Sequence, residues 1–315
     1  MMFSVLGAGV AGLCAATALA ERGARVEVID PDPDPTGASH YAGGMLAPFC
    51  EGEAAPEVVV TTGQSAREWW AERVPDVVQA GTLVVAPPRD RAELDRFARA
   101  TRGHSWVDPG SLEPDLAGRF ARALHFVDEA HLDPRAACKA LIARLIDMGA
   151  ELFFGTGAHP RGQIVDCRGL AAKDLLPGLR AVRGEMLMLH TDEVTLARPV
   201  RLLHPRFPCY IVPRGQGRFM VGATMVESDD AGPITARATM ELLSAAYALH
   251  PAFAEASLLE TGAGLRPSLP DNVPSVQFRA DRIFVNGLYR HGFLMAPALA
   301  EEVAQTVFQE KAHAS

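Results

Sequence analysis

The sequence has few cysteines, and none of them pairs with another in a metal-binding motif. The five stand singly along the chain, without a C-x-x-C pair, at Cys14, Cys50, Cys138, Cys167 and Cys209. An odd set of scattered thiols is typical of a reducing compartment and supplies no recognisable metal ligand set. We therefore expect a cytoplasmic protein without a metal site.

Long apolar runs are also lacking. No stretch reaches the roughly 18 apolar residues that a membrane-spanning helix needs. The N-terminal segment 10–20 is apolar, but no basic residues precede it, and the phased glycines around it are unlike the apolar core of a secretory signal. The sequence therefore predicts no membrane association.

Basic residues are in the minority, and lysine is nearly absent. The 315 residues carry a net charge of −8, and only three are lysines: Lys139, Lys173 and Lys311. A nucleic-acid-binding protein usually shows a basic stripe, so no nucleic-acid partner is expected. At 48% hydrophobic residues, the chain is long enough for two globular domains.

The first thirty residues resemble a dinucleotide-binding unit in pattern and order. An apolar strand, Phe3–Leu6, is followed by Gly7, Gly9 and Gly12 in a G-x-G-x-x-G motif, then by an alanine-rich helix and a strand Arg25–Ile29. The first glycine suits the tight turn, the second lets backbone N–H groups approach a pyrophosphate, and the third allows helix and strand to pack closely. The positive end of the helix dipole then faces the phosphates.

The second strand of this unit ends at an acidic residue, Asp30. A carboxylate at this place accepts a hydrogen bond from the adenosine ribose and repels a 2′-phosphate. The sequence therefore favours FAD or NAD over NADP.

The remainder of the chain alternates between helix and strand patterns without an internal repeat. Helices are expected over residues 57–72, 134–148, 235–249 and 293–308, and strands over 81–86, 151–154, 164–169 and 282–285. Short alternating runs over 183–223 predict antiparallel sheet, with a hairpin between Tyr210–Pro213 and Arg218–Val221. This order predicts an α/β protein whose domains are interleaved.

Several further segments carry a resemblance to a known family. They are Ala42–Pro48, Tyr210–Arg214, Val221–Met225, Gly264–Pro267, Pro270–Asn272 and Tyr289–Pro297. In their order, and over nearly the whole chain, they resemble the FAD-dependent amino acid oxidases of the D-amino acid oxidase superfamily. Within it the resemblance is strongest to the glycine oxidases, the branch that serves thiamine biosynthesis.

This resemblance implies an α/β fold with two interleaved domains. A Rossmann-like FAD-binding domain with a parallel sheet is expected from residues 1–48, 130–178 and 258–315. An α+β substrate-binding domain on an antiparallel sheet is expected from residues 49–129 and 179–257. Relatives form tetramers, so a homo-oligomer, a dimer or a tetramer, is also implied.

The resemblance also implies the substrate site. Arg266 is expected to bind the substrate carboxylate through two parallel hydrogen bonds, with help from the Tyr210 hydroxyl. Met225 and Met45 are expected beside the substrate α-carbon as an apolar wall. Arg290 is expected at the pocket entrance or the flavin edge.

FAD is expected to bind noncovalently, because relatives with covalent flavin use a cysteine near the C-terminus and none follows Cys209. His40 is a further candidate neighbour of the flavin, and the amides that begin the closing helix are expected at its pyrimidine edge. The implied FAD contacts are Gly7, Gly9, Val10, Ala11, Gly12, Asp30, Pro31, Ala38, Ser39, Gly43, Gly44, Met45, Ala158, Gly169, Leu288, Tyr289, Arg290, His291, Gly292, Phe293 and Leu294.

The implied reaction is the oxidative deamination of glycine. In this family a neutral amine loses a hydride without a dedicated acid or base, and no catalytic triad or paired carboxylates lie near the motifs. The products are the imine, or glyoxylate and ammonia, with O₂ reduced to H₂O₂, and the imine is expected to pass to a thiazole synthase.

Other interpretations remain open from the sequence. Pro208 stands where the family has a histidine, so the substrate could instead be sarcosine, a D-amino acid or D-proline, with O₂ or another electron acceptor. A third hypothesis is an RNA-linked amine oxidase of a tRNA-modification system, and a fourth is a flavin-binding protein without turnover.

Overall fold

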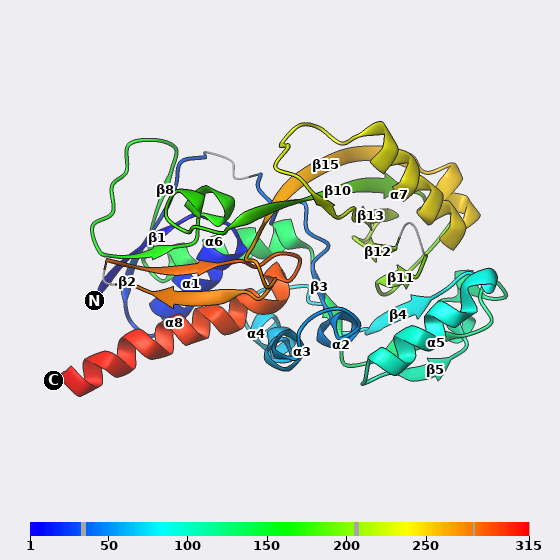
Figure 1. Ribbon diagram of the computed structural model, residues 1–315, viewed down its shortest axis with the longest axis horizontal. Helices are drawn as coiled ribbons and strands as arrows, with labels where there is room; N and C mark the ends of the chain where they lie inside the picture. Colours follow the sequence, from blue (N-terminus) through cyan, green and yellow to red (C-terminus); the bar gives the residue numbers. More distant parts are fainter. Residues whose placement is uncertain (33–35, 205–207, 280, 315) are drawn as a thin grey trace.

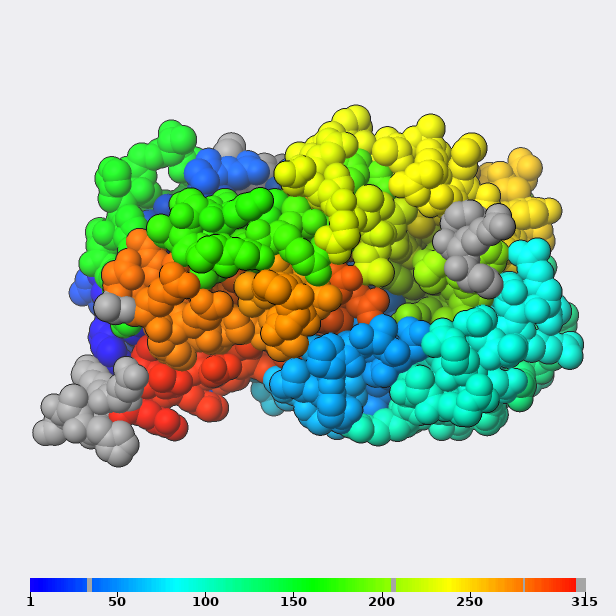
Figure 2. All heavy atoms as spheres, viewed as in Figure 1, coloured from blue at the N-terminus to red at the C-terminus, as the bar shows by residue number. Residues whose placement is uncertain are grey.

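The computed structural model describes residues 1–32, 36–204, 208–279 and 281–314, except for the side chains of 310–314. Figure 1 shows two groups of strands toward opposite ends of the long axis, with both termini at the same end. In the space-filling view, the yellow and cyan surfaces of the middle of the chain share the other end (Figure 2). Within the described chain, none of the helices combines the length and apolar character that crossing a membrane requires.

A six-stranded sheet holds the N-terminal strand near its centre, in the order β16-β17-β9-β1-β2-β8. Its strands are β1 (Met2–Leu6), β2 (Arg25–Asp30), β8 (Glu151–Phe154), β9 (Gln163–Asp166), β16 (Ser275–Phe278) and β17 (Arg282–Asn286). All neighbours pair in parallel except β16 and β17. The predicted parallel sheet is confirmed, and its strand order reverses beside β1, where open α/β sheets bind ligands.

Three helices pack around this sheet and one another: α1 (Val10–Glu21), α6 (Pro134–Asp147) and α8 (Gly292–Ala314). Helix α1 is buried at every position from Val10 to Leu19, because α6 and α8 also pack against it. Its small alanine side chains permit such close packing. Asp133 caps the N-terminus of α6, since its carboxylate accepts hydrogen bonds from the N–H groups of Arg135 and Ala136.

A nine-stranded sheet forms the other group of strands, in the order β14-β10-β13-β12-β11-β4-β6-β5, with β15 paired to β10. Its strands are β4 (Thr82–Val85), β5 (Ser105–Val107), β6 (Ala123–Phe126), β10 (Arg180–His190), β11 (Val200–Leu202), β12 (Cys209–Pro213), β13 (Arg218–Gly222), β14 (Val226–Glu227) and β15 (Ser257–Ser268). The predicted hairpin is confirmed as the antiparallel pair β12 and β13. Helix α7 (Ala236–Leu249) packs against β10, β12 and β13, and α5 (Arg91–Ala100) packs against β6.

The prediction of one helix over 57–72 is wrong. The segment forms two helices, α3 (Glu57–Gly63) and α4 (Ala66–Ala71). Gly63 ends α3 where α8 approaches closely, since a Cβ there would lie 2.7 Å from Leu294 Cγ. The break lets α4 place Trp70 against α8, where its indole N–H donates a hydrogen bond to Phe293 O at 2.8 Å. The domain boundaries expected from the sequence stay a prediction.

Candidate active site

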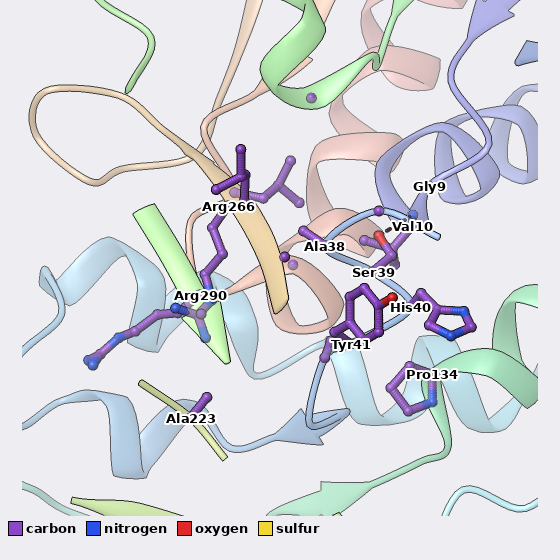
Figure 3. A pocket seen from close by; sticks show the side chains of 18 of the residues that line it. Gly9, Val10, Ala38, Ser39, His40, Tyr41, Pro134, Ala223, Arg266 and Arg290 are labelled. Atoms are coloured by element: carbon purple, nitrogen blue, oxygen red, sulfur yellow. Dashed lines mark hydrogen bonds between the residues drawn. The ribbon is translucent and has the colours of Figure 1, made fainter. Parts of the chain in front are cut away.

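A cavity of about 1410 Å³ is lined by residues from both sheets. Pockets for small ligands usually measure about 300–1,000 Å³, so this one has room for a dinucleotide together with a small substrate. In Figure 3, Gly9, Val10, Ser39 and Pro134 lie on one side of the view and Arg266 on the other. We call the side with Gly9 and Val10 the cofactor half and the side with Arg266 the substrate half.

The glycine motif packs tightly, as expected. Gly7 has a φ of +98°, and a Cβ there would lie 2.6 Å from Cys167 O at the end of β9. A Cβ at Gly12 would collide with the carbonyl oxygen of Gly7. Gly12 therefore sets the distance between helix α1 and strand β1 and does not itself line the cavity.

The N-terminus of α1 opens onto the cofactor half. Gly9 is the N-cap residue and provides no side-chain cap, while the N–H of Val10 donates a hydrogen bond to Ser39 Oγ at 3.0 Å. The Asp30 carboxylate accepts hydrogen bonds from the N–H groups of Ala8 (2.7 Å) and Asp32 (3.0 Å). Asp30 thus holds the glycine turn in place, and each carboxylate oxygen keeps a lone pair that can accept a further hydrogen bond.

The loop with Gly43 and Gly44 packs closely against Tyr210 of β12 and against Leu132. A Cβ at Gly43 would lie 2.7 Å from a ring carbon of Tyr210, and Gly44 has a φ of +68° with Leu132 O directly beside it. Arg214, which follows β12, donates a hydrogen bond to Gly43 O at 2.8 Å. Burial lowers the pKa of Arg214 to about 10, so it remains charged at neutral pH. Only glycine permits this close approach of the loop.

Arg266 lies on β15, which pairs with the adjacent strand β10. A side chain at Gly184 of β10 would collide with the Arg266 guanidinium, so the guanidinium lies against this backbone. Its Nη1 donates a hydrogen bond to Thr224 O at 3.1 Å. The glycine therefore makes the space in which the cation sits.

Arg266 differs from the other arginines of the cavity in its lack of an anionic partner. The others pair with carboxylates: Arg135 with Glu260, Arg168 with Asp166, Arg201 with Glu53, Arg237 with Glu241 and Arg290 with Glu51. Within the part of the chain that the structure describes, Arg266 has no carboxylate partner. A guanidinium in this condition suits a carboxylate ligand.

Tyr210 stands among the charged groups of the substrate half. Burial raises the pKa of its hydroxyl, while the nearby charges of Arg266, Arg214 and Arg290 act to lower it and that of Glu51 to raise it. The hydroxyl is therefore protonated at neutral pH and available as a hydrogen-bond donor to an anion.

Glu51 ends the short helix α2 (Pro48–Glu51) and contacts the two residues directly before α8. Its Oε2 lies 2.7 Å from Arg290 Nη2 and 3.4 Å from His291 Nδ1. Burial acts to raise the pKa of Glu51, but the charges of Arg290, His291 and Arg201 outweigh it and hold the pKa below its usual value. Burial also lowers the pKa of His291, so this imidazole is neutral at neutral pH.

Two polar atoms beside this ion pair are buried without a hydrogen-bond partner among the described residues: Arg290 Nε and His291 Nδ1. Buried polar atoms are normally satisfied, so their convergence is typical of a site that is completed by a ligand. Together with the glycine cradle and the cavity volume, these atoms fit a bound dinucleotide and substrate.

The cavity brings together nearly all the residues predicted for the site; only Gly12 and Ala158 lie outside its lining. Ala158 lies on the connection between β8 and β9. Met225 is 56% exposed, and its Sδ accepts a hydrogen bond from the Tyr289 hydroxyl at 2.7 Å, so it lies at a rim of the cavity. The individual roles assigned to these residues stay predictions.

Sequence reasoning missed Glu51, Arg201, Thr224 and Gly184, which also line the cavity. A glycine inside a strand signals a close approach, so Gly184 could have been found. Glu51 gives no local signal, since it follows Cys50 in an ordinary helical turn.

Comparisons with known proteins show the family of the chain. Residues 3–306 match the family described as FAD dependent oxidoreductase. A protein of Rhizobium etli provisionally named thiamine biosynthesis oxidoreductase ThiO is 56% identical over 319 residues, which cover 99% of this chain and 98% of that protein.

Two further relatives are more distant. The bifunctional protein ThiO/ThiG of a Nostoc species is 26% identical over 343 residues, covering 98% of this chain and 52% of that protein. The crystal structure of glycine oxidase from Geobacillus kaustophilus has the same fold, with a TM-score of 0.82 at 24% identity over 98% of this chain and 94% of that one. The chain belongs to the family of FAD dependent oxidoreductases.

Proposed function

We propose that this chain is an FAD-dependent amino acid oxidase that converts glycine, and other small amines, to the imine. Each turnover reduces one O₂ to H₂O₂, and water hydrolyses the free imine to glyoxylate and ammonia. The observation that carries this proposal is Arg266, a guanidinium without a carboxylate partner in the described chain that shares one cavity with the dinucleotide cradle. The motifs shared with glycine oxidases and the name of the Rhizobium relative support it.

The proposed tasks of the chain are binding and orientation. FAD, when bound, supplies the hydride acceptor. Arg266 and the Tyr210 hydroxyl hold the substrate carboxylate, which fixes the direction of the α-carbon. The glycine turn and the N-terminal amides of α1 hold the pyrophosphate, and Asp30 holds the ribose.

The amine has to be neutral before its α-carbon can lose a hydride. No side chain of the substrate half is needed as a base, and the low pKa of Glu51 makes that carboxylate a weak one. We expect kcat/KM for glycine to rise between pH 7 and pH 9, because deprotonated amine becomes more abundant. A fall over this range would contradict the neutral-amine requirement.

We further propose that the imine passes to a thiazole synthase. The bifunctional ThiO/ThiG protein supports this, because a chain similar to this one makes up about half of it. A cytoplasmic location, a dimeric or tetrameric assembly and the division into an FAD-binding and a substrate-binding domain also stay proposals.

The first experiment is anaerobic reduction of the purified holoprotein. Glycine, sarcosine, D-alanine and D-proline are added in turn while flavin absorbance is followed, and air is then admitted and H₂O₂ measured. Bleaching by glycine with one H₂O₂ per amine supports the proposal. A flavin that none of these amines bleaches contradicts it and would direct attention to RNA-linked amines, with RNA retention at low salt as the next measurement.

A further inference from the structure

Arg266 and Arg290 both line the substrate half of the cavity, and they differ in their charge partners. Arg266 donates to a backbone carbonyl and has no carboxylate partner in the described chain. Arg290 is paired with Glu51, with 2.7 Å between Nη2 and Oε2. Both arginines line the same cavity and both act on the Tyr210 hydroxyl, so the two guanidinium groups lie around one region.

Glu51 is built into this region as a fixed anion. Its side chain is 20% exposed, that of Arg290 is 23% exposed, and Glu51 Oε2 is fully buried between Arg290 and His291. The cations around it keep Glu51 ionised, and His291 is neutral. At neutral pH, Glu51 therefore cancels the positive charge of Arg290. Among the described residues that line the cavity, this leaves Arg266 as the arginine without a carboxylate partner.

We propose that Glu51 determines substrate specificity by restricting the pocket to amines that carry a single carboxylate. A second carboxylate, attached through a methylene group to the amine nitrogen, would have to displace Glu51 from Arg290 or lie beside it as a like charge. Either arrangement is unfavourable, so the ion pair acts as a repulsive element against dicarboxylates. This inference rests on the proposed function, because it assumes that Arg266 holds the first carboxylate.

Sarcosine and iminodiacetate test this inference most directly. Both are secondary amines with one N-carboxymethyl group, and they differ in whether the second substituent is a methyl or a carboxymethyl group. The quantity measured is the ratio of kcat/KM for sarcosine to kcat/KM for iminodiacetate, from H₂O₂ release by holoprotein. In both cases the amine loses two electrons and two protons to become the imine, and O₂ receives them.

Glu51→Gln keeps the size of the side chain and frees the charge of Arg290. We expect the ratio to fall by about tenfold to a hundredfold, because the second carboxylate can then form a charge-assisted hydrogen bond with Arg290. Glu51→Asp keeps the charge and should leave the ratio within about threefold of the parent, a tolerance set by context. In the double variant with Arg290→Gln, the improvement for iminodiacetate should disappear because the guanidinium is removed.

Glu21→Gln is the matched control. Glu21 has a similarly buried side chain, 19% exposed, and an arginine partner, Arg73, at 2.8 Å, but neither residue lines the cavity. The ratio of kcat/KM for sarcosine to kcat/KM for iminodiacetate should not change in Glu21→Gln. An unchanged ratio in Glu51→Gln with normal flavin content would overturn the inference.

If Glu51→Gln does not fold, Arg290→Gln alone still decides the question. It leaves Glu51 as an anion without its guanidinium, so the ratio should rise by about tenfold or more. An unchanged ratio would overturn the inference. Failure of the proposed function looks different, because then neither glycine nor sarcosine reduces the flavin of the parent protein.

Discussion

The two halves of the cavity differ in whether backbone groups or side chains line them. In the cofactor half, backbone groups line the cavity: the turn at Gly7, the helix N-terminus at Gly9 and the loop at Gly44. In the substrate half, charged side chains face it: Arg266 and the pair Glu51 and Arg290. Under the proposed function, the first half would recognise phosphate by shape and dipole, and the second would recognise a small acid by the number and placement of charges.

This difference has a consequence for substitution. A backbone site depends on the absence of side chains, so added atoms disrupt it, whereas a charge site depends on the atoms at the ends of long side chains. Changes in one half should therefore leave the other half working. Substitutions of Gly12 and Arg266 test that independence.

Gly12→Ala should have the largest effect and should break the cofactor half. The new methyl group would collide with the Gly7 carbonyl oxygen, so α1 has to move away from β1. We expect the free energy of unfolding to fall by about 3 kcal/mol or more, and the protein to be purified largely without FAD. The ratio of flavin absorbance to protein absorbance measures this. Gly37→Ala adds a methyl group at another glycine of the cavity lining, where a Cβ meets none of the described residues within 4 Å, and serves as the control; equal flavin content in the two variants would contradict the packing argument.

Arg266→Lys should break the substrate half alone. A lysine loses the two-pronged contact with a carboxylate, so KM for glycine should rise by roughly tenfold to a thousandfold, from about 1.5–4 kcal/mol of lost charge-assisted bonding. Flavin content should be unchanged. Steady-state kinetics measures KM, and Arg237→Lys is the control because that arginine lines the cavity but pairs with Glu241. Unchanged glycine turnover would show that the carboxylate site lies elsewhere.

Glu129→Gln should change how the free energy of unfolding depends on pH. Glu129 is fully buried behind α2, accepts a hydrogen bond from the N–H of Cys50 at 2.7 Å, and burial raises its pKa from 4.5 to about 7. Between pH 4.5 and about 7, Glu129 is protonated in the folded protein but ionised in the unfolded chain. The free energy of unfolding therefore falls as pH rises through this range.

The substitution should remove that loss. Relative to the parent, Glu129→Gln should gain about 3 kcal/mol in free energy of unfolding between about pH 4 and pH 8, with no further change at higher pH. Denaturant unfolding of both proteins at a series of pH values measures the difference. Burial lowers the pKa of the neighbouring His131 to about 4, which gives the opposite slope in both proteins and cancels in the comparison. A difference that does not depend on pH would show that Glu129 ionises normally.

Asp133→Ala should have the smallest effect. The carboxylate accepts hydrogen bonds from two amides at the start of α6, at 2.8 and 3.2 Å, and its loss should cost about 1 kcal/mol of stability. Thermal unfolding measures this. Thr235→Ala removes a cap with one such bond, at 3.1 Å to Ala238 N, and should cost less. The reverse order would mean that cap geometry does not set the cost.

Much of the fold could be predicted because its signals are local. The strand before Gly7, the helix after it, the cap at Asp133 and the hairpin around Gly215 each depend on a few neighbouring residues. The break between α3 and α4 could not be predicted this way, since the reason for it is the approach of Leu294, more than two hundred residues away. Strand β15 was also missed, since the glycines in it hide a strand that is defined by its partner β10.

The same division holds for the site. The sequence by itself determined the dinucleotide cradle, because a turn, a helix start and a strand end follow one another within thirty residues and their backbone geometry is set by glycine. Family motifs indicated Arg266 and Tyr210. Only the tertiary structure decided which charges compensate one another: Arg290 meets Glu51 and, within the described chain, Arg266 meets no carboxylate, because strands and helices distant in sequence bring these side chains together. Coulomb interactions depend on distance in space, which the order of residues does not contain.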